Sequence, residues 1–110
     1  MTSFDEREKA FEAKYRLDQE TTFKVTVRRN KLLGQWAAGE FGLTGADADA
    51  YAREVVESDF QQPGDADVVA KILGDFAARG RPMDEERLRK QMERLFALAR
   101  DQVLQESGKA

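Results

Sequence analysis

The stretch from Thr21 to Leu43 constrains the fold most strongly, because its apolar residues lie on two faces of a helix. The broader face carries Phe23, Val27, Leu33, Ala37, Ala38 and Phe41. The opposite face carries Val25, Leu32, Trp36 and Leu43. A helix that is apolar on two sides packs between other elements. Gly34 lies at the centre of the broader face, and a glycine inside a helix costs about 1 kcal/mol relative to alanine. This cost indicates a close helix contact at Gly34, and the stretch is predicted to be the central helix of a small bundle.

Length and composition exclude several classes of protein. A chain of 110 residues is large enough for one domain with a core. Its net charge of −3 argues against a dedicated binder of nucleic acids or anionic membranes, which would be basic. Cysteine and histidine are both absent, which excludes disulfides, metal sites built from these residues, and imidazole catalysis. The polar N-terminus and the lack of a long apolar run predict a soluble, cytoplasmic protein that does not insert into membranes. The two-sided apolar pattern of 21–43 predicts a bundle that is a monomer when free.

Charge is distributed unevenly along the chain. Basic residues outnumber acidic ones in 21–43, and acidic residues outnumber basic ones in 44–64. The cations of the central helix form one polar stripe of Lys24, Arg28 and Lys31 with Gln35, while Arg29 and Glu40 form a thinner stripe. Attraction between two neighbouring helices explains this distribution more simply than a functional basic patch does.

Turn and capping residues mark the boundaries of four helices. The central helix is predicted to end at Gly42, and the second helix to begin at Thr44, with Asp47 completing its cap. Pro63 and Gly64 form a turn before the third helix, which begins at Asp65 or Asp67 and ends at Gly80. Asp84 caps the fourth helix. The inner faces of the three later helices are predicted to carry Ala48, Tyr51, Ala52, Val55, Val68, Val69, Ile72, Leu73, Phe76, Ala77, Leu88, Met92, Leu95, Phe96, Ala99 and Val103. No strand pattern competes, so the predicted fold is all-α, a four-helix bundle with mostly antiparallel neighbours.

The first twenty residues have a different character from the rest. Phe4, Phe11 and Tyr15 form a narrow stripe, and nearly everything else in this segment is charged or alanine. So thin an apolar face buries too little surface to be held firmly, which predicts a mobile or partly helical N-terminal arm over 1–20 and a bundle over 21–110. The three aromatic residues are expected either to pack back on the bundle or to bind a groove in another protein.

No group of residues indicates catalysis. Acidic pairs such as Glu85–Glu86 are typical of the first turn of a helix, and the serines have no imidazole partner. Gly-rich phosphate loops are absent, and the basic run Arg28–Lys31 points to different sides of a helix. The sequence predicts a protein that is not an enzyme, with no cofactor, no metal site and no nucleic-acid partner.

Three segments carry a resemblance to a known family. They resemble the zeta subunits of α-proteobacterial F-type ATP synthases. The segments are Phe4–Arg7 with Ala10–Tyr15, Arg28–Ala38, and Ser58–Phe60 with Pro63–Gly64 and Asp67–Val68. The resemblance covers essentially the whole chain. It implies a small four-helix protein that inhibits ATP hydrolysis by the ATP synthase, and whose N-terminal arm enters a catalytic interface of the alpha, beta and gamma subunits and blocks rotation.

The resemblance assigns a contact role to the arm, on Phe4, Arg7, Phe11, Lys14 and Tyr15. The aromatic side chains are expected to fill apolar pockets, and the cations to meet acidic rims of the interface at the cytoplasmic face of the enzyme. Two alternatives remain open. One is a bundle that binds a small ligand such as a nucleotide beside Gly34 and Trp36, with Asn30 or Asp59 converging on it. The other is an adaptor protein that uses the bundle surface.

Overall fold

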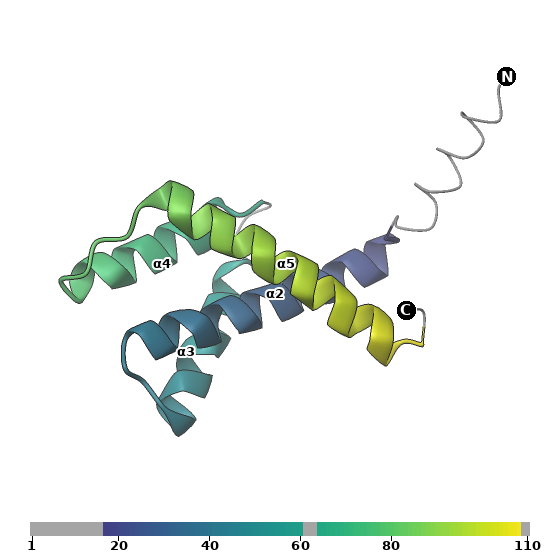
Figure 1. The fold of residues 1–110 in the computed structure, drawn as a ribbon, viewed down its shortest axis with the longest axis horizontal. Helices are drawn as coiled ribbons and strands as arrows, with labels where there is room; N and C mark the ends of the chain where they lie inside the picture. The colour runs from purple at the N-terminus through teal and green to yellow at the C-terminus, as the bar shows by residue number, and fades with distance from the viewer. Residues whose placement is uncertain (1–16, 61–63, 109–110) are drawn as a thin grey trace, which may run out of the picture.

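The computed structural model describes residues 17–60 and 64–108, and this part of the chain contains four helices and no strand (Figure 1). The helices are α2 (Gln19–Glu40), α3 (Gly45–Ser58), α4 (Ala66–Ala78) and α5 (Glu85–Glu106). The predicted all-α, four-helix fold is therefore confirmed. Within the described ranges, no helix is both long enough and apolar enough to cross a membrane.

Capping residues explain where the two long helices begin. The Asp18 carboxylate accepts a hydrogen bond of 2.7 Å from the backbone N–H of Thr21, so α2 begins at Gln19, two residues before the predicted start. Asp84 accepts in the same way from the N–H of Arg87, at 3.3 Å, and begins α5 as predicted.

The end of α2 also follows the sequence pattern. Gly42 has a φ of 78°, and the N–H of Leu43 donates to the carbonyl of Ala38 at 2.9 Å. This left-handed glycine with a bond across six residues is the Schellman arrangement that closes a helix. Arg81 adds a donor from the loop after α4, because its guanidinium binds the Glu40 carbonyl and lies 3.7 Å from the Glu40 carboxylate.

The two shorter helices use their predicted caps differently. Thr44 and Asp65 occupy the N-cap positions of α3 and α4, but neither side chain makes a capping hydrogen bond. Asp65 instead directs its carboxylate to Arg29 of α2. The α3 helix ends at Ser58, before the turn predicted at Pro63 and Gly64.

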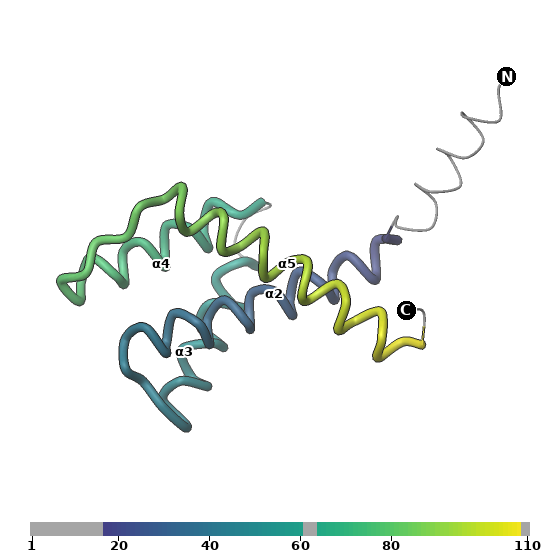
Figure 2. Tube along the Cα trace, in the orientation of Figure 1, coloured from purple at the N-terminus to yellow at the C-terminus, as the bar shows by residue number. Residues whose placement is uncertain are grey.

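The α2 helix is the central element, as predicted, and contacts each of the other three. Figure 2 shows α2 and α5 running in opposite directions along the molecule. Gly34 faces Ala52 of α3, the rings of Trp36 and Phe76 of α4 lie 5.9 Å apart, and Arg28 binds α5.

All four helices contribute to one apolar core, and a smaller cluster lies near the N-terminal end of α2. The main core consists of Leu33, Ala37, Ala38, Tyr51, Val55, Val68, Val69, Ile72, Phe76, Leu88, Met92 and Leu95. The smaller cluster consists of Val25, Ala99 and Val103, with Leu17, Leu32 and Phe96 packed against it. Most of the predicted inner-face residues are therefore confirmed.

Phe23 is the clearest exception, since its side chain is 57% exposed. The sequence pattern placed it on the broad inner face of α2. That face is covered by α3, which ends at Ser58, and the Phe60 ring just beyond this end lies 6.0 Å from the Phe23 ring.

Candidate interaction surfaces

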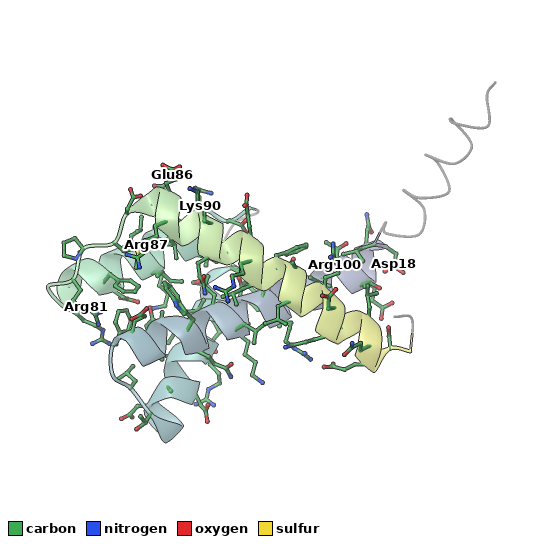
Figure 3. All side chains as sticks on the ribbon, in the orientation of Figure 1. Asp18, Arg81, Glu86, Arg87, Lys90 and Arg100 are labelled. Atoms are coloured by element: carbon green, nitrogen blue, oxygen red, sulfur yellow. The ribbon has the colours of Figure 1, made fainter. Side chains whose placement is uncertain are left out.

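The five predicted contact residues of the arm lie outside the described residues: Phe4, Arg7, Phe11, Lys14 and Tyr15. The described part of the chain begins at Leu17, two positions after Tyr15. Leu17 packs on the smaller apolar cluster, and Asp18 caps α2 and marks its end in Figure 3. Three residues, 16–18, separate Tyr15 from the start of the central helix at Gln19.

A buried polar cluster connects α2 to the ends of α3 and α4. The Arg29 guanidinium is 5% exposed and reaches both carboxylate oxygens of Asp65, at 2.8 and 3.4 Å. Its Nε donates to the Asn30 side-chain oxygen at 2.9 Å, and the Asn30 amide nitrogen donates to Asp59 at 2.8 Å. Each buried polar group in this cluster thus has a protein partner, as buried polar groups require.

This cluster bears on the ligand-binding alternative. Asn30 and Asp59 do converge, and they bind each other at 2.8 Å. The space beside Gly34 is occupied by Ala52 and Val55 of α3. The cluster therefore acts as a clasp that ties α2 to the α3–α4 connection.

The burial of Arg29 differs from the prediction of a polar stripe. Arg29 is four residues from Val25 and four from Leu33, both of which are fully buried. At this spacing Arg29 lies between the two on the helix surface, so the periodicity of α2 already contained the signal. A partner for the cation was needed before burial could be inferred, and Asp65 lies 36 residues away in the sequence.

Replacing Asp65 by Ala is expected to destabilise the bundle by about 1–2 kcal/mol, because it leaves the buried Arg29 cation without its carboxylate. The expected loss is below that of a fully buried pair, since the Asp65 side chain is 43% exposed and water can reach the site. Urea unfolding measures the change. Asp101→Ala is the matched control, because Asp101 is 65% exposed and its pair with Arg100 spans 3.7 Å. Equal effects of the two substitutions would contradict the clasp.

A second polar contact joins α2 to the C-terminal end of α5. The Arg28 guanidinium donates to Gln102 at 2.8 Å and to Glu106 at 2.7 Å. The hydrogen bond from Arg28 holds the pKa of the Glu106 carboxyl below its usual range. Next to this contact lies a hollow of about 380 Å³ between the two helices, lined by Phe23, Lys24, Val27, Arg28, Lys31, Val103, Glu106 and Ser107.

The Tyr51 hydroxyl has a structural role in the contact between α3 and α4. The Tyr51 hydroxyl donates to Asp75 at 2.7 Å, and Lys71 lies 3.1 Å from the same carboxylate. Burial, and then the bond to Asp75, raise the pKa of the Tyr51 phenol above its usual value, so it stays protonated and cannot serve as a base near neutral pH. Among the described residues there is no group of three or more acidic residues that could hold a metal ion.

Comparisons with known proteins agree with the sequence resemblance. A family model described as ATPase inhibitor subunit zeta matches residues 1–102, a range that includes all five predicted contact residues of the arm. No curated protein sequence matches the chain. One solved structure, described only as the solution NMR structure of a protein, is 43% identical and covers 76% of this chain and 95% of its own, with a TM-score of 0.67.

Proposed function

Because the chain belongs to the family of ATPase inhibitor subunit zeta, we propose that it inhibits ATP hydrolysis by inserting its N-terminal arm into a catalytic interface of the F-type ATP synthase and blocking rotation. Members of this family are regulatory proteins and not enzymes, and membership supports an inhibitory role at the ATP synthase. The partner in this proposal is the catalytic sector, formed by the alpha, beta and gamma subunits, at the cytoplasmic face of the enzyme.

The arm, residues 1–20, would supply the inhibitory contact. Phe4, Phe11 and Tyr15 would enter apolar pockets, and Arg7 and Lys14 would pair with acidic groups around them. The family match carries this proposal, because it begins at residue 1 and so extends over the arm as well as the bundle.

The bundle supports the proposal because the start of α2 is capped and packed by residues that follow the five predicted contact residues. Asp18 caps this helix, and Leu17 is packed against the smaller apolar cluster. The helices behind them bury apolar residues from all four elements against one another. The bundle can therefore present the arm while keeping its own fold.

Removing residues 1–16 is expected to abolish inhibition of ATP hydrolysis while changing the midpoint of thermal unfolding little. The deletion keeps Leu17 and Asp18, and so keeps both the apolar contact and the cap of α2. Inhibition is measured by titrating the cognate ATP synthase with full-length and shortened protein. A shortened protein that inhibits as well as the full chain would place the active surface on the bundle. A full chain that does not inhibit would leave the adaptor function.

A further inference from the structure

Two exposed aromatic side chains form a ridge on the bundle. Phe23 of α2 is 57% exposed, Phe60 just after α3 is 61% exposed, and their ring centroids lie 6.0 Å apart. Val27 and Val56 lie beside them, in the wall of a hollow of about 310 Å³. When a partner covers exposed apolar side chains, their surface is removed from water, which lowers the free energy. Neighbouring exposed apolar side chains therefore mark a site of interaction. We call Phe23 and Phe60 the aromatic ridge.

The α5 side of the ridge is cationic. Phe23, Val27 and Val103 line the floor of the hollow between α2 and α5. Its lining contains three cations, Lys24, Arg28 and Lys31, and one carboxylate, that of Glu106. The surface therefore combines an apolar floor with an excess of positive charge.

Two of these cations already have partners. Arg28, 27% exposed, is held by Gln102 and Glu106, whereas Lys24 is 59% exposed and lies 3.5 Å from Glu20, which is 82% exposed. Pairs between exposed groups contribute little and exchange readily for other partners. On the other side of the ridge, the carboxylates of Asp59 and Asp65 are bound by Asn30 and Arg29. An acidic partner is thus attracted on the α5 side.

The short distance between the ridge and the arm indicates which protein the ridge would meet. Phe23 lies only six positions after Leu17 in the chain. Almost all of these lie in α2, where each residue advances the chain by about 1.5 Å, so the ridge lies about 9–10 Å beyond the base of the arm. A protein that holds the arm up to Tyr15 is therefore within reach of the ridge.

We infer that the aromatic ridge and the adjoining cationic hollow form a second contact with the enzyme that binds the arm. This inference rests on the proposed function. The occupant is an acidic surface segment of the catalytic sector beside the point where the arm enters, with an apolar side chain that packs against Phe23 and carboxylates that meet Lys24 and Lys31. The arm then blocks the enzyme, and the ridge raises the affinity with which it is held.

Replacing both ridge residues in the full-length protein, Phe23→Ser with Phe60→Ser, tests this inference. The concentration for half-maximal inhibition of ATP hydrolysis is expected to rise roughly tenfold to a hundredfold, because exposed aromatic anchors often dominate an interface. Inhibition at saturation should stay complete, since the arm is unchanged. Leu98→Ser is the matched control, because Leu98 is an exposed apolar residue of α5, 45% exposed, that lines neither hollow. Its half-maximal concentration should match wild type.

Charge reversal tests the cationic side separately. Lys24→Glu with Lys31→Glu should raise the half-maximal concentration most at low salt, because added salt already screens the attraction in the wild-type protein. Lys90→Glu is the control: Lys90 is 74% exposed and lies far along α5 from Asp18 (Figure 3).

The outcomes separate the two proposals. Suppose that wild type inhibits, and that the double serine variant and the double glutamate variant both have its half-maximal concentration. The ridge inference is then wrong and the proposed function stands. If wild type does not inhibit, the proposed function is wrong, and this inference with it. Sedimentation of the free protein gives a further test. If wild type is a dimer and the variant Phe23→Ser with Phe60→Ser is a monomer, the ridge binds a second copy of the chain and the inference is wrong.

Discussion

Replacing Gly34 by Leu is expected to destabilise the bundle by about 3 kcal/mol, at the upper end of what overpacking a core costs. A Cβ atom at this position would lie 2.6 Å from the Cα atom of Ala52, and 3.2 and 3.3 Å from the Cβ atoms of Ala52 and Val55. The nearest of these atoms belongs to the backbone, so rotation of a side chain cannot relieve the contact. The α3 helix would have to move away from α2, and the core between them would lose its packing.

A pair of alanine substitutions gives the matched control for this result. Gly34→Ala should destabilise, since its Cβ atom alone makes the same contact. Gly74→Ala in α4 should stabilise by up to about 1 kcal/mol, because a Cβ atom there meets nothing within 4 Å and alanine favours the helix. Urea unfolding of the three variants measures the free energies. If Gly34→Ala is as stable as wild type, α2 and α3 do not approach each other as closely as the structure has them.

Replacing Phe11 and Tyr15 together by Ala is expected to weaken inhibition by two to three orders of magnitude. Aromatic anchors buried in an interface commonly contribute on the order of 2 kcal/mol each, and about 1.4 kcal/mol corresponds to a factor of ten in affinity. Both residues precede Leu17, so neither the cap nor the core of the bundle is altered. The half-maximal concentration for inhibition of ATP hydrolysis measures the loss, and the thermal unfolding midpoint should be unchanged.

The choice of control for this variant follows from the structure. Asp18 would appear suitable because it is a charged residue of the arm, but it caps α2, and its replacement would cost about 1 kcal/mol of stability. Glu12 is therefore the better control, since it neighbours Phe11 and lies outside the aromatic stripe. Glu12→Ala should shift the half-maximal concentration much less than the double substitution. Equal losses would mean that the aromatic stripe is not the inhibitory surface.

The sequence by itself determined the helices and the family. Capping and turn residues act within a few positions of the chain, so Asp84 and Gly42 mark helix ends whatever surrounds them. The two-sided apolar pattern of α2 has the same local character and identified the central helix. The cost of a glycine inside that helix then pointed to the contact that Ala52 makes with Gly34. The residues that carry the family resemblance are likewise read directly from the chain.

Only the tertiary structure decided which parts of α2 are covered. Phe23 and Leu33 both belong to its broad apolar face, yet Leu33 is fully buried and Phe23 is 57% exposed, because α3 ends before it reaches Phe23. Arg29 shares a face with Val25 and is buried because Asp65, 36 residues away, supplies its counter-charge. Periodicity assigns a residue to a face, but the ends and side chains of distant helices determine whether that face meets protein or water.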